Sequence, residues 1–297
     1  MTSYFIVTSH GWSASNWLAY VLNHHQDIIC THSARNILAS KKDMNSDENL
    51  RKNIKNLHQG YLLRQNRSLD RCYDEIEKNG KAKCYGSVHV YRMRDLPVLY
   101  EKYGAPKREY SVLNLIRHPV SLVWSGYGQF RELFRYDLNE LYWTSGKILK
   151  TAKDFVFDLA EEYDLYIGDL ENLAFIGASA VLGSLRLDFD AEEKLGELPG
   201  IYFLGHIKME DITVSPETLS NVIQILSHQE LDADDNYLRT VYSMGIVNQH
   251  KNDPNKHNAR EKYLKFTDWQ KKVFLYFMNL YDLVKPYQRL GYDLSFL

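Results

Sequence analysis

Residues 4–18 read Tyr4-Phe5-Ile6-Val7-Thr8-Ser9-His10-Gly11-Trp12-Ser13-Ala14-Ser15-Asn16-Trp17-Leu18, and this stretch decides the fold. Residues 5–8 are apolar or β-branched, as expected of a strand buried on both faces of a sheet. Apolar residues then recur at helical spacing, at Trp17, Leu18, Val21 and Leu22. The stretch therefore predicts a buried strand, a loop of small residues and a helix.

The loop from Ser9 to Asn16 is a candidate anion site. Backbone N–H groups converge at the N-terminus of a helix, and serine or asparagine side chains beside them suit a phosphate or sulfate group. The loop lacks the Gly-Lys-Ser/Thr sequence of a Walker A motif. The alternative is an ordinary connection from strand to helix in which Ser13 or Ser15 caps the helix.

The composition is that of a folded globular protein. Of the 297 residues, 44% are hydrophobic and 13% aromatic, which is enough for a sizeable core. A net charge of −2 and an isoelectric point near 6.6 argue against general binding to nucleic acid or anionic membranes. The three cysteines, Cys30, Cys72 and Cys84, show no CxxC spacing and indicate buried thiols in a reducing cytoplasm.

No targeting or membrane-spanning segment is predicted. The N-terminus has neither the basic region nor the long apolar run of a signal peptide. The most apolar later stretch, Leu173 to Leu185, is shorter than a bilayer span and is predicted to be a buried helix. We therefore expect a cytoplasmic protein without a transmembrane segment.

The rest of the chain alternates between strand and helix patterns. Further buried strands are expected at residues 27–31, 83–90, 111–116 and 201–206. Helix starts are predicted near Ser46, Ser68, Pro119, Ser215 and Thr267, and the last helix is expected to run to about Leu290. The alternation predicts a single domain over residues 1–297, an α/β fold of three layers (α/β/α) with a mostly parallel central sheet and a mainly helical insertion at about 137–195.

The chain resembles the PAPS-dependent sulfotransferases in the segment Leu115-Ile116-Arg117-His118-Pro119-Val120-Ser121-Leu122-Val123-Trp124-Ser125-Gly126-Tyr127. In that family a strand ends in Arg-x-Pro, and the next helix carries a serine eight residues after the arginine. Arg117 and Ser125 take these places, so the resemblance implies that both bind the 3′-phosphate of the nucleotide. The chemistry agrees, because a guanidinium pairs with phosphate oxygens and a hydroxyl two turns onward lies on the same side of the helix.

The first loop resembles the family's 5′-phosphosulfate loop, Pro-Lys-x-Gly-Thr-Thr-Trp. When Trp17 is placed on the family's tryptophan, Trp12 takes the place of the lysine. The resemblance implies that the cofactor is bound by Gly11, Trp12, Ser13, Ala14, Ser15 and Asn16. An indole cannot supply the positive charge with which the lysine contacts the sulfonate, and the candidate substitutes are His10, Arg35 and Lys256.

The segment Gly86-Ser87-Val88-His89, followed by Asp95-Leu96-Pro97, resembles the strand that carries the family's catalytic histidine. The resemblance implies that His89 is the general base that takes the proton of the acceptor. A histidine titrates near neutral pH and suits this role. His32, also at the end of a predicted strand, is the competing candidate.

Two later regions complete the resemblance. Lys208-Met209-Glu210-Asp211-Ile212 and the closing Leu290-Gly291-Tyr292 are similar to the family's last strand and terminal segment, and Lys256 and Arg260 loosely match the basic segment that closes over the 3′-phosphate. The resemblance implies a P-loop nucleotide-hydrolase-like fold, PAPS as sulfuryl donor, PAP as product, no metal, and a small-molecule or glycan acceptor with a hydroxyl or amine group.

Two alternatives stay open. The first is a non-catalytic protein that binds PAP or PAPS and has lost activity together with the loop lysine. The second, less favoured, is a P-loop kinase, which would need a Walker lysine and magnesium ligands that the sequence does not show.

Overall fold

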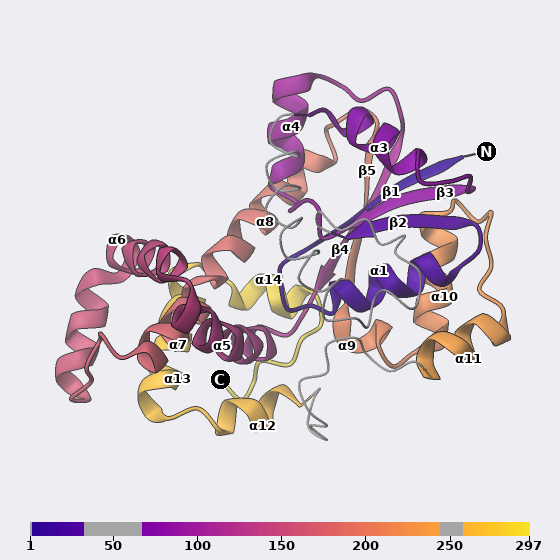
Figure 1. The fold of residues 1–297 in the computed structure, drawn as a ribbon. Coiled ribbons are helices and arrows are strands. Elements are labelled where there is room, and N and C mark those ends of the chain that lie inside the picture. Colours follow the sequence, from indigo (N-terminus) through magenta and orange to yellow (C-terminus); the bar gives the residue numbers. More distant parts are fainter. Residues whose placement is uncertain (1, 33–66, 244–257) are drawn as a thin grey trace. The chain divides into compact units, whose positions relative to one another are not determined.

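The computed structural model describes residues 2–32, 67–243 and 258–297 of the chain (Figure 1). These residues belong to two compact units. The first, here called the sheet unit, comprises Met1–Ile116 and Asp188–Asn252, and the second, the helical unit, comprises Arg117–Leu187 and Asp253–Leu297. The helix predicted to start near Ser46 lies outside the described residues.

The sheet unit is built on five parallel strands in the order β2-β3-β1-β4-β5. The strands are β1 (Ser3–Ser9), β2 (Ile28–His32), β3 (Cys84–Val88), β4 (Tyr110–Ile116) and β5 (Ile201–Lys208). All five strands predicted from the sequence are present, and the parallel α/β class is confirmed. The strand order matches the predicted P-loop-like fold, with β1 between β3 and β4.

Helices cover both faces of this sheet, because successive side chains of a strand point to opposite faces. Phe5 and Val7 of β1 belong to a core cluster that includes residues of α1 (Ser15–His24), α10 (Pro216–Leu226) and α11 (Asp235–Ser243). Ile6 belongs to the opposite cluster, with residues of α3 (Leu69–Glu77), α4 (Asp95–Tyr103) and α8 (Leu182–Leu195). One short helix, α9 (Met209–Ile212), follows β5. The sheet unit therefore has three layers.

The helical unit contains the helices α5 (Pro119–Tyr136), α6 (Leu138–Glu162), α7 (Leu170–Ala180), α12 (Ala259–Leu264), α13 (Asp268–Leu280) and α14 (Val284–Arg289), and the first residues of α8. Phe175 of α7 is fully buried, and its ring packs edge to face against Tyr127 of α5 and Trp269 of α13. Residues 138–195 are thus mostly helical, as predicted. That they are an insertion into one domain stays a prediction.

The helix signals in the sequence are mostly confirmed. The Ser68 and Ser215 side chains accept N–H groups of their helices, Pro119 is the first residue of α5, and Thr267 forms a capping box with Gln270. The predicted long C-terminal helix is wrong, because α13 ends at Leu280 and α14 begins at Val284. Asp282 between them has φ 46°, a left-handed conformation that interrupts a helix.

The apolar stretch around Leu173 to Leu185 is two helices, α7 and α8, that meet at Val181, instead of the one helix predicted. By length and composition alone, the run Leu170–Leu195 could cross a membrane, and it is the one such run among the described residues. Core helices pass the same test, and Ala174 to Ser179 are buried in the protein. The absence of a transmembrane segment stays a prediction.

The packing of Phe5 over Gly86 gives a test of the sheet. The two residues are partners in the β1–β3 register, and a Cβ on Gly86 would lie 1.9 Å from Cζ of the Phe5 ring. We expect Gly86→Ala to lower the free energy of unfolding by about 1–3 kcal/mol, because the core is overpacked. The measurement is urea denaturation. Gly128→Ala on α5 is the control: it has open space, so it should be neutral or stabilise by up to about 1 kcal/mol.

Candidate functional site

The loop between β1 and α1 has an unusual backbone. Trp12 and Ala14 have φ values of 68° and 55°, in the left-handed region that residues other than glycine rarely adopt. The N-cap of α1 is Ala14, so the expectation that Ser13 or Ser15 caps this helix is wrong. Because alanine has no side-chain acceptor, the first N–H groups of α1 receive no side-chain cap. Such an end is suited to an anion.

Ser13 supplies a second sign of a ligand in this loop. The residue is fully buried, and within the described part of the chain its Oγ has no hydrogen-bond partner. A buried hydroxyl left without a partner costs about 1–3 kcal/mol. A ligand oxygen beside the loop would remove this cost.

Two histidines, at the ends of β3 and β2, contact serines of this loop. His89, directly after β3, has its Nδ1 2.7 Å from Oγ of Ser9, and His32, the last residue of β2, has its Nε2 2.9 Å from Oγ of Ser15. Their rings are stacked, with centroids 5.3 Å apart. The structure therefore brings together both histidines that the sequence offered as the base, each beside a serine at one end of the loop.

We assign the proton of neutral His89 to Nδ1. Three groups face this atom: Oγ of Ser9, the Ser9 carbonyl oxygen at 3.1 Å and, farther away at 3.5 Å, Nη1 of Arg92; the nearer carbonyl can only accept a hydrogen bond and decides the assignment. Nδ1–H can donate to either oxygen, which leaves the lone pair on Nε2. Nε2 is then the atom of His89 that can take a proton. Nε2 of His32, by contrast, faces Ser15.

The pKa of His89 lies well below its usual range. Burial is the main cause, because it penalises the charged imidazolium, and the nearby positive charge of Arg92 acts in the same direction, followed by His32 and His10. The hydrogen bond to the Ser9 carbonyl opposes this shift only in part. His89 is therefore neutral, the form required of a base.

Arg92 is a cation of this site that the sequence did not reveal. Its guanidinium Nη1 donates to the Ser9 carbonyl oxygen and lies 3.5 Å from Nδ1 of His89. Its backbone N–H donates to Asp95 Oδ2 at 2.8 Å, which ties it to the first turn of α4. The only sequence signal was an arginine shortly after a candidate base at a strand end.

A buried carboxyl contacts Arg94, which lies two residues after Arg92 in the same connection. Asp188 of α8 is 3.7 Å from the guanidinium of Arg94 and accepts the Arg94 backbone N–H at 3.3 Å. Burial raises the pKa of Asp188 to about 6, although Arg94 and Arg92 both act to lower it. The β3–α4 connection is thus held to α8 by contacts inside the sheet unit.

The helical unit carries the second set of candidate residues. Arg117 follows the last residue of β4, and its Nη1 donates to Oγ of Ser125 at 2.6 Å. The two side chains are therefore together, as predicted, although Arg117 precedes the helix, whose N-cap is His118. Their binding of a 3′-phosphate stays a prediction.

A buried lysine of a neighbouring helix also contacts a serine of α5. Lys262 of α12 is 2% exposed, and its Nζ donates at 3.2 Å to Oγ of Ser121. Ser121 is on α5, four residues before Ser125. Sequence reasoning did not single out Lys262 within the basic segment. Arg260 is exposed, and its charge helps to lower the pKa of Asp293, after the hydrogen bonds from Ser295. Lys256 and Arg35 lie outside the described residues.

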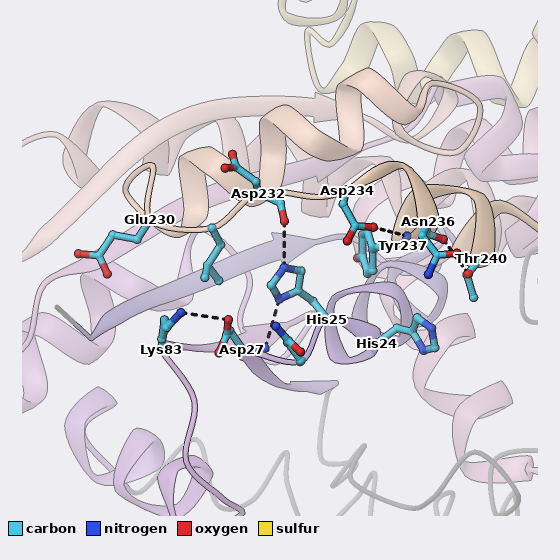
Figure 2. Close-up of a pocket in the computed structure, with 12 residues that line it drawn as sticks. His24, His25, Asp27, Lys83, Glu230, Asp232, Asp234, Asn236, Tyr237 and Thr240 are labelled. Carbon is cyan, nitrogen blue, oxygen red and sulfur yellow. Dashed lines mark hydrogen bonds and ion pairs between the residues drawn. The ribbon is translucent and has the colours of Figure 1, made fainter.

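A polar hollow of about 360 Å³ lies elsewhere in the sheet unit (Figure 2). Its lining includes Asp27 and Lys83, which directly precede β2 and β3, so the hollow is at the opposite end of these strands from His32 and His89. Several of its polar groups satisfy one another: Lys83 pairs with Asp27 at 3.2 Å, and Nε2 of His25 donates to the Asp232 carbonyl. We therefore read it as a solvated surface hollow.

Comparison with known proteins gives limited information. No family model matches the chain, and neither does any curated protein. Two similar solved structures are the sulfotransferase domain from the Synechococcus PCC 7002 olefin synthase (TM-score 0.45, 14% identity, 99% of this chain and 96% of that chain) and the sulfotransferase domain from the curacin biosynthetic pathway (TM-score 0.42, 15% identity, 99% and 98%). Both identities and both TM-scores are low, so these similarities establish no function for this chain.

The lowered pKa of His89 predicts a loss of stability in acid. The unfolded histidine titrates at about 6.5, so below that pH the unfolded chain binds a proton that folded His89 does not. The free energy of unfolding should therefore fall as the pH drops from about 6.5 toward the pKa of folded His89. Urea denaturation between about pH 5 and pH 8 measures this slope. We expect a shallower slope for His89→Gln; an identical slope would contradict the neutral, buried state of His89.

Proposed function

We propose that the protein is a sulfotransferase that moves a sulfuryl group from PAPS to a hydroxyl or amine group of an acceptor. The observation that carries this proposal is that groups suited to anions follow both of the paired strands β1 and β4: the uncapped start of α1 follows β1, and the Arg117–Ser125 pair follows β4. In parallel α/β sheets, ligands bind beyond the carboxyl ends of the strands. PAPS carries anionic groups at its 5′ and 3′ positions, and each set offers the chemistry that one of these groups requires.

The first set suits the 5′-phosphosulfate. Gly11, Trp12, Ser13, Ala14, Ser15 and Asn16 would hold it through the uncapped start of α1 and the buried Ser13 hydroxyl. The left-handed Ala14 supports this assignment, because it replaces a side-chain cap by open N–H groups.

The second set suits the 3′-phosphate. Arg117 and Ser125 would hold this group, and Lys262 adds a buried positive charge on the same side of α5. Charge-assisted hydrogen bonds from arginine and lysine to phosphate are among the stronger polar contacts in proteins. ATP has no 3′-phosphate, so these residues would favour PAP and PAPS over ATP. The role of Arg260 and Lys256 in the same subsite stays a prediction.

PAPS would supply the sulfuryl group, and the protein would supply position, charge and a base. The acceptor oxygen forms a bond to sulfur while the bond from sulfur to the 5′-phosphate oxygen breaks, and PAP leaves. Nε2 of His89 takes the acceptor proton. A neutral, half-buried imidazole held by Ser9 through its other nitrogen fits this task.

The tryptophan at position 12, where the family has a lysine, favours one alternative, a protein that binds PAP or PAPS without turnover. An indole carries no charge for the transferred group. The small-molecule or glycan acceptor, the absence of a nucleic-acid partner and the cytoplasmic location stay predictions from the sequence.

Calorimetry with PAP tests the binding half of the proposal. We expect the wild-type protein to bind PAP more tightly than ATP. Arg117→Ala should weaken PAP binding by about 10- to 100-fold, because a hydrogen bond to a charged group contributes about 1.5–3 kcal/mol. Arg135→Ala is the matched control on the same helix, since Arg135 is exposed and pairs with Glu132. Equal affinities for Arg117→Ala and wild type would reject the 3′-phosphate subsite.

Transfer from ³⁵S-labelled PAPS to a panel of hydroxyl-bearing and amine-bearing acceptors tests the catalytic half. His89→Gln should lower the transfer rate by about 10²- to 10⁴-fold and leave PAP affinity nearly unchanged, because a general base acts in the transition state. Wild-type protein that binds PAP and transfers nothing would favour the non-catalytic alternative. Transfer by His89→Gln at the wild-type rate would exclude His89 as the base.

A further inference from the structure

We propose that Arg92 is a catalytic residue of the sulfotransferase site, whose guanidinium contacts the transferred sulfuryl group and supplies the positive charge that the β1–α1 loop lacks. This inference rests on the proposed function and adds a residue to it. Neither Arg92 nor the segment Val90 to Met93 was among the residues assigned from the sequence.

The reaction creates a need for such a charge. As the bond from sulfur to the 5′-phosphate oxygen breaks, its electron pair stays on that oxygen, and negative charge builds up there. A cation already in place stabilises this charge without reorganisation. The loop from Ser9 to Asn16 contains neither lysine nor arginine. Its N–H groups carry only partial charges, and a histidine such as His10 is charged only when protonated, so a permanent charge must come from outside the loop.

The structure places Arg92 at the beginning of this loop. Nη1 donates to the carbonyl oxygen of Ser9, the last residue of β1. A guanidinium has five N–H donors in one plane, so it can contact several acceptors at once. The backbone on both sides is anchored, because Tyr91 and Met93 are 1% and 0% exposed and the Arg92 N–H is bonded to Asp95. The guanidinium is thus held at the loop by packing as well as by hydrogen bonding.

The same guanidinium lies beside the proposed base. Its Nη1 is 3.5 Å from Nδ1 of His89, so the charge is next to the residue that would receive the acceptor proton. A positive neighbour also favours the neutral imidazole, and Arg92 helps to lower the pKa of His89 after burial itself. One residue would therefore stabilise the leaving oxygen and keep the base ready. Arg92 itself neither gains nor loses a proton in the step.

A purely structural role is the competing interpretation. Arg92 could serve only to tie the end of β1 to the β3–α4 connection through Ser9 and Asp95. A tether would affect thermal stability and PAP binding together. A catalytic cation would affect turnover and the pH profile more than PAP affinity, because PAP keeps the leaving oxygen but lacks the sulfuryl group that Arg92 contacts.

The test compares Arg92→Gln and Arg92→Lys with wild type by PAP calorimetry, thermal unfolding and the rate of ³⁵S transfer. We expect Arg92→Gln to lower kcat by about 10²- to 10³-fold, the usual cost of removing one group that stabilises developing charge, with a clearly smaller loss of PAP affinity. Arg92→Lys should keep part of the activity. The acid limb of the pH–rate profile should move to higher pH in Arg92→Gln, because His89 loses a positive neighbour.

A charge-relocation variant sharpens the test. Trp12→Lys places a cation in the loop itself, and we expect it, combined with Arg92→Gln, to restore much of the transfer rate that Arg92→Gln loses. A tether role would predict no such rescue. Lys102→Gln is the charge-matched control, because Lys102 is exposed on α4 and should leave turnover unchanged.

The failures of the two proposals are distinguishable. Wild-type transfer that persists unchanged in Arg92→Gln would overturn the role of Arg92 and leave the sulfotransferase proposal standing. Loss of transfer accompanied by equal loss of PAP binding and thermal stability, without rescue by Trp12→Lys, would assign Arg92 to the tether. Wild-type protein that does not bind PAP would overturn the sulfotransferase proposal and this inference together.

Discussion

The site of the sheet unit depends on the register of β1 between β3 and β4. Val7 is the partner of Val88, and the His89 N–H donates to the Val7 carbonyl at 2.8 Å. This pairing places His89 at the point where β1 gives way to the loop that begins at Ser9. A slip of one residue would send every side chain of a strand to the opposite face and separate His89 from Ser9. The geometry of the base is therefore a consequence of backbone pairing.

A buried polar chain along the same register supports this arrangement. Thr8 donates to Oδ1 of Asn114 at 2.9 Å, Nδ2 of Asn114 donates to Nδ1 of His206 at 3.1 Å, and Nε2 of His206 donates to Glu192 of α8 at 3.2 Å. The chain of bonds crosses β1, β4 and β5. Satisfied polar networks of this kind specify one arrangement, because any other register would leave buried donors and acceptors unpaired. Polar residues in an otherwise apolar sheet thus hold the strand ends in place.

Periodicity and local spacing carried the successful sequence predictions. The strands were readable as apolar runs, and Arg117 and Ser125 are close in sequence, eight residues apart across the start of α5. Arg92, the contact of His32 with Ser15, and the contact of Lys262 with Ser121 join residues far apart in the chain, so no local pattern could reveal them. The predictions of the α1 cap, at Ala14, and of one long C-terminal helix, interrupted at Asp282, failed for another reason. Both are residues other than glycine with positive φ, a conformation that sequence signals seldom mark.

Three of the seven described residues other than glycine that have positive φ lie at the proposed reaction centre. Trp12, Ala14 and His89 all have positive φ, and each such residue costs on the order of 1–3 kcal/mol. The rest of the sheet unit must offset this cost through its two apolar clusters. In return, the helix start stays uncapped by side chains and the base is turned toward Ser9. A loop shaped in this way offers backbone N–H groups rather than a permanently charged side chain, and in our proposal Arg92 of the neighbouring β3–α4 connection supplies the full charge. Under this proposal, Arg92 supplies the charge that Trp12, at the place of the family's lysine, does not.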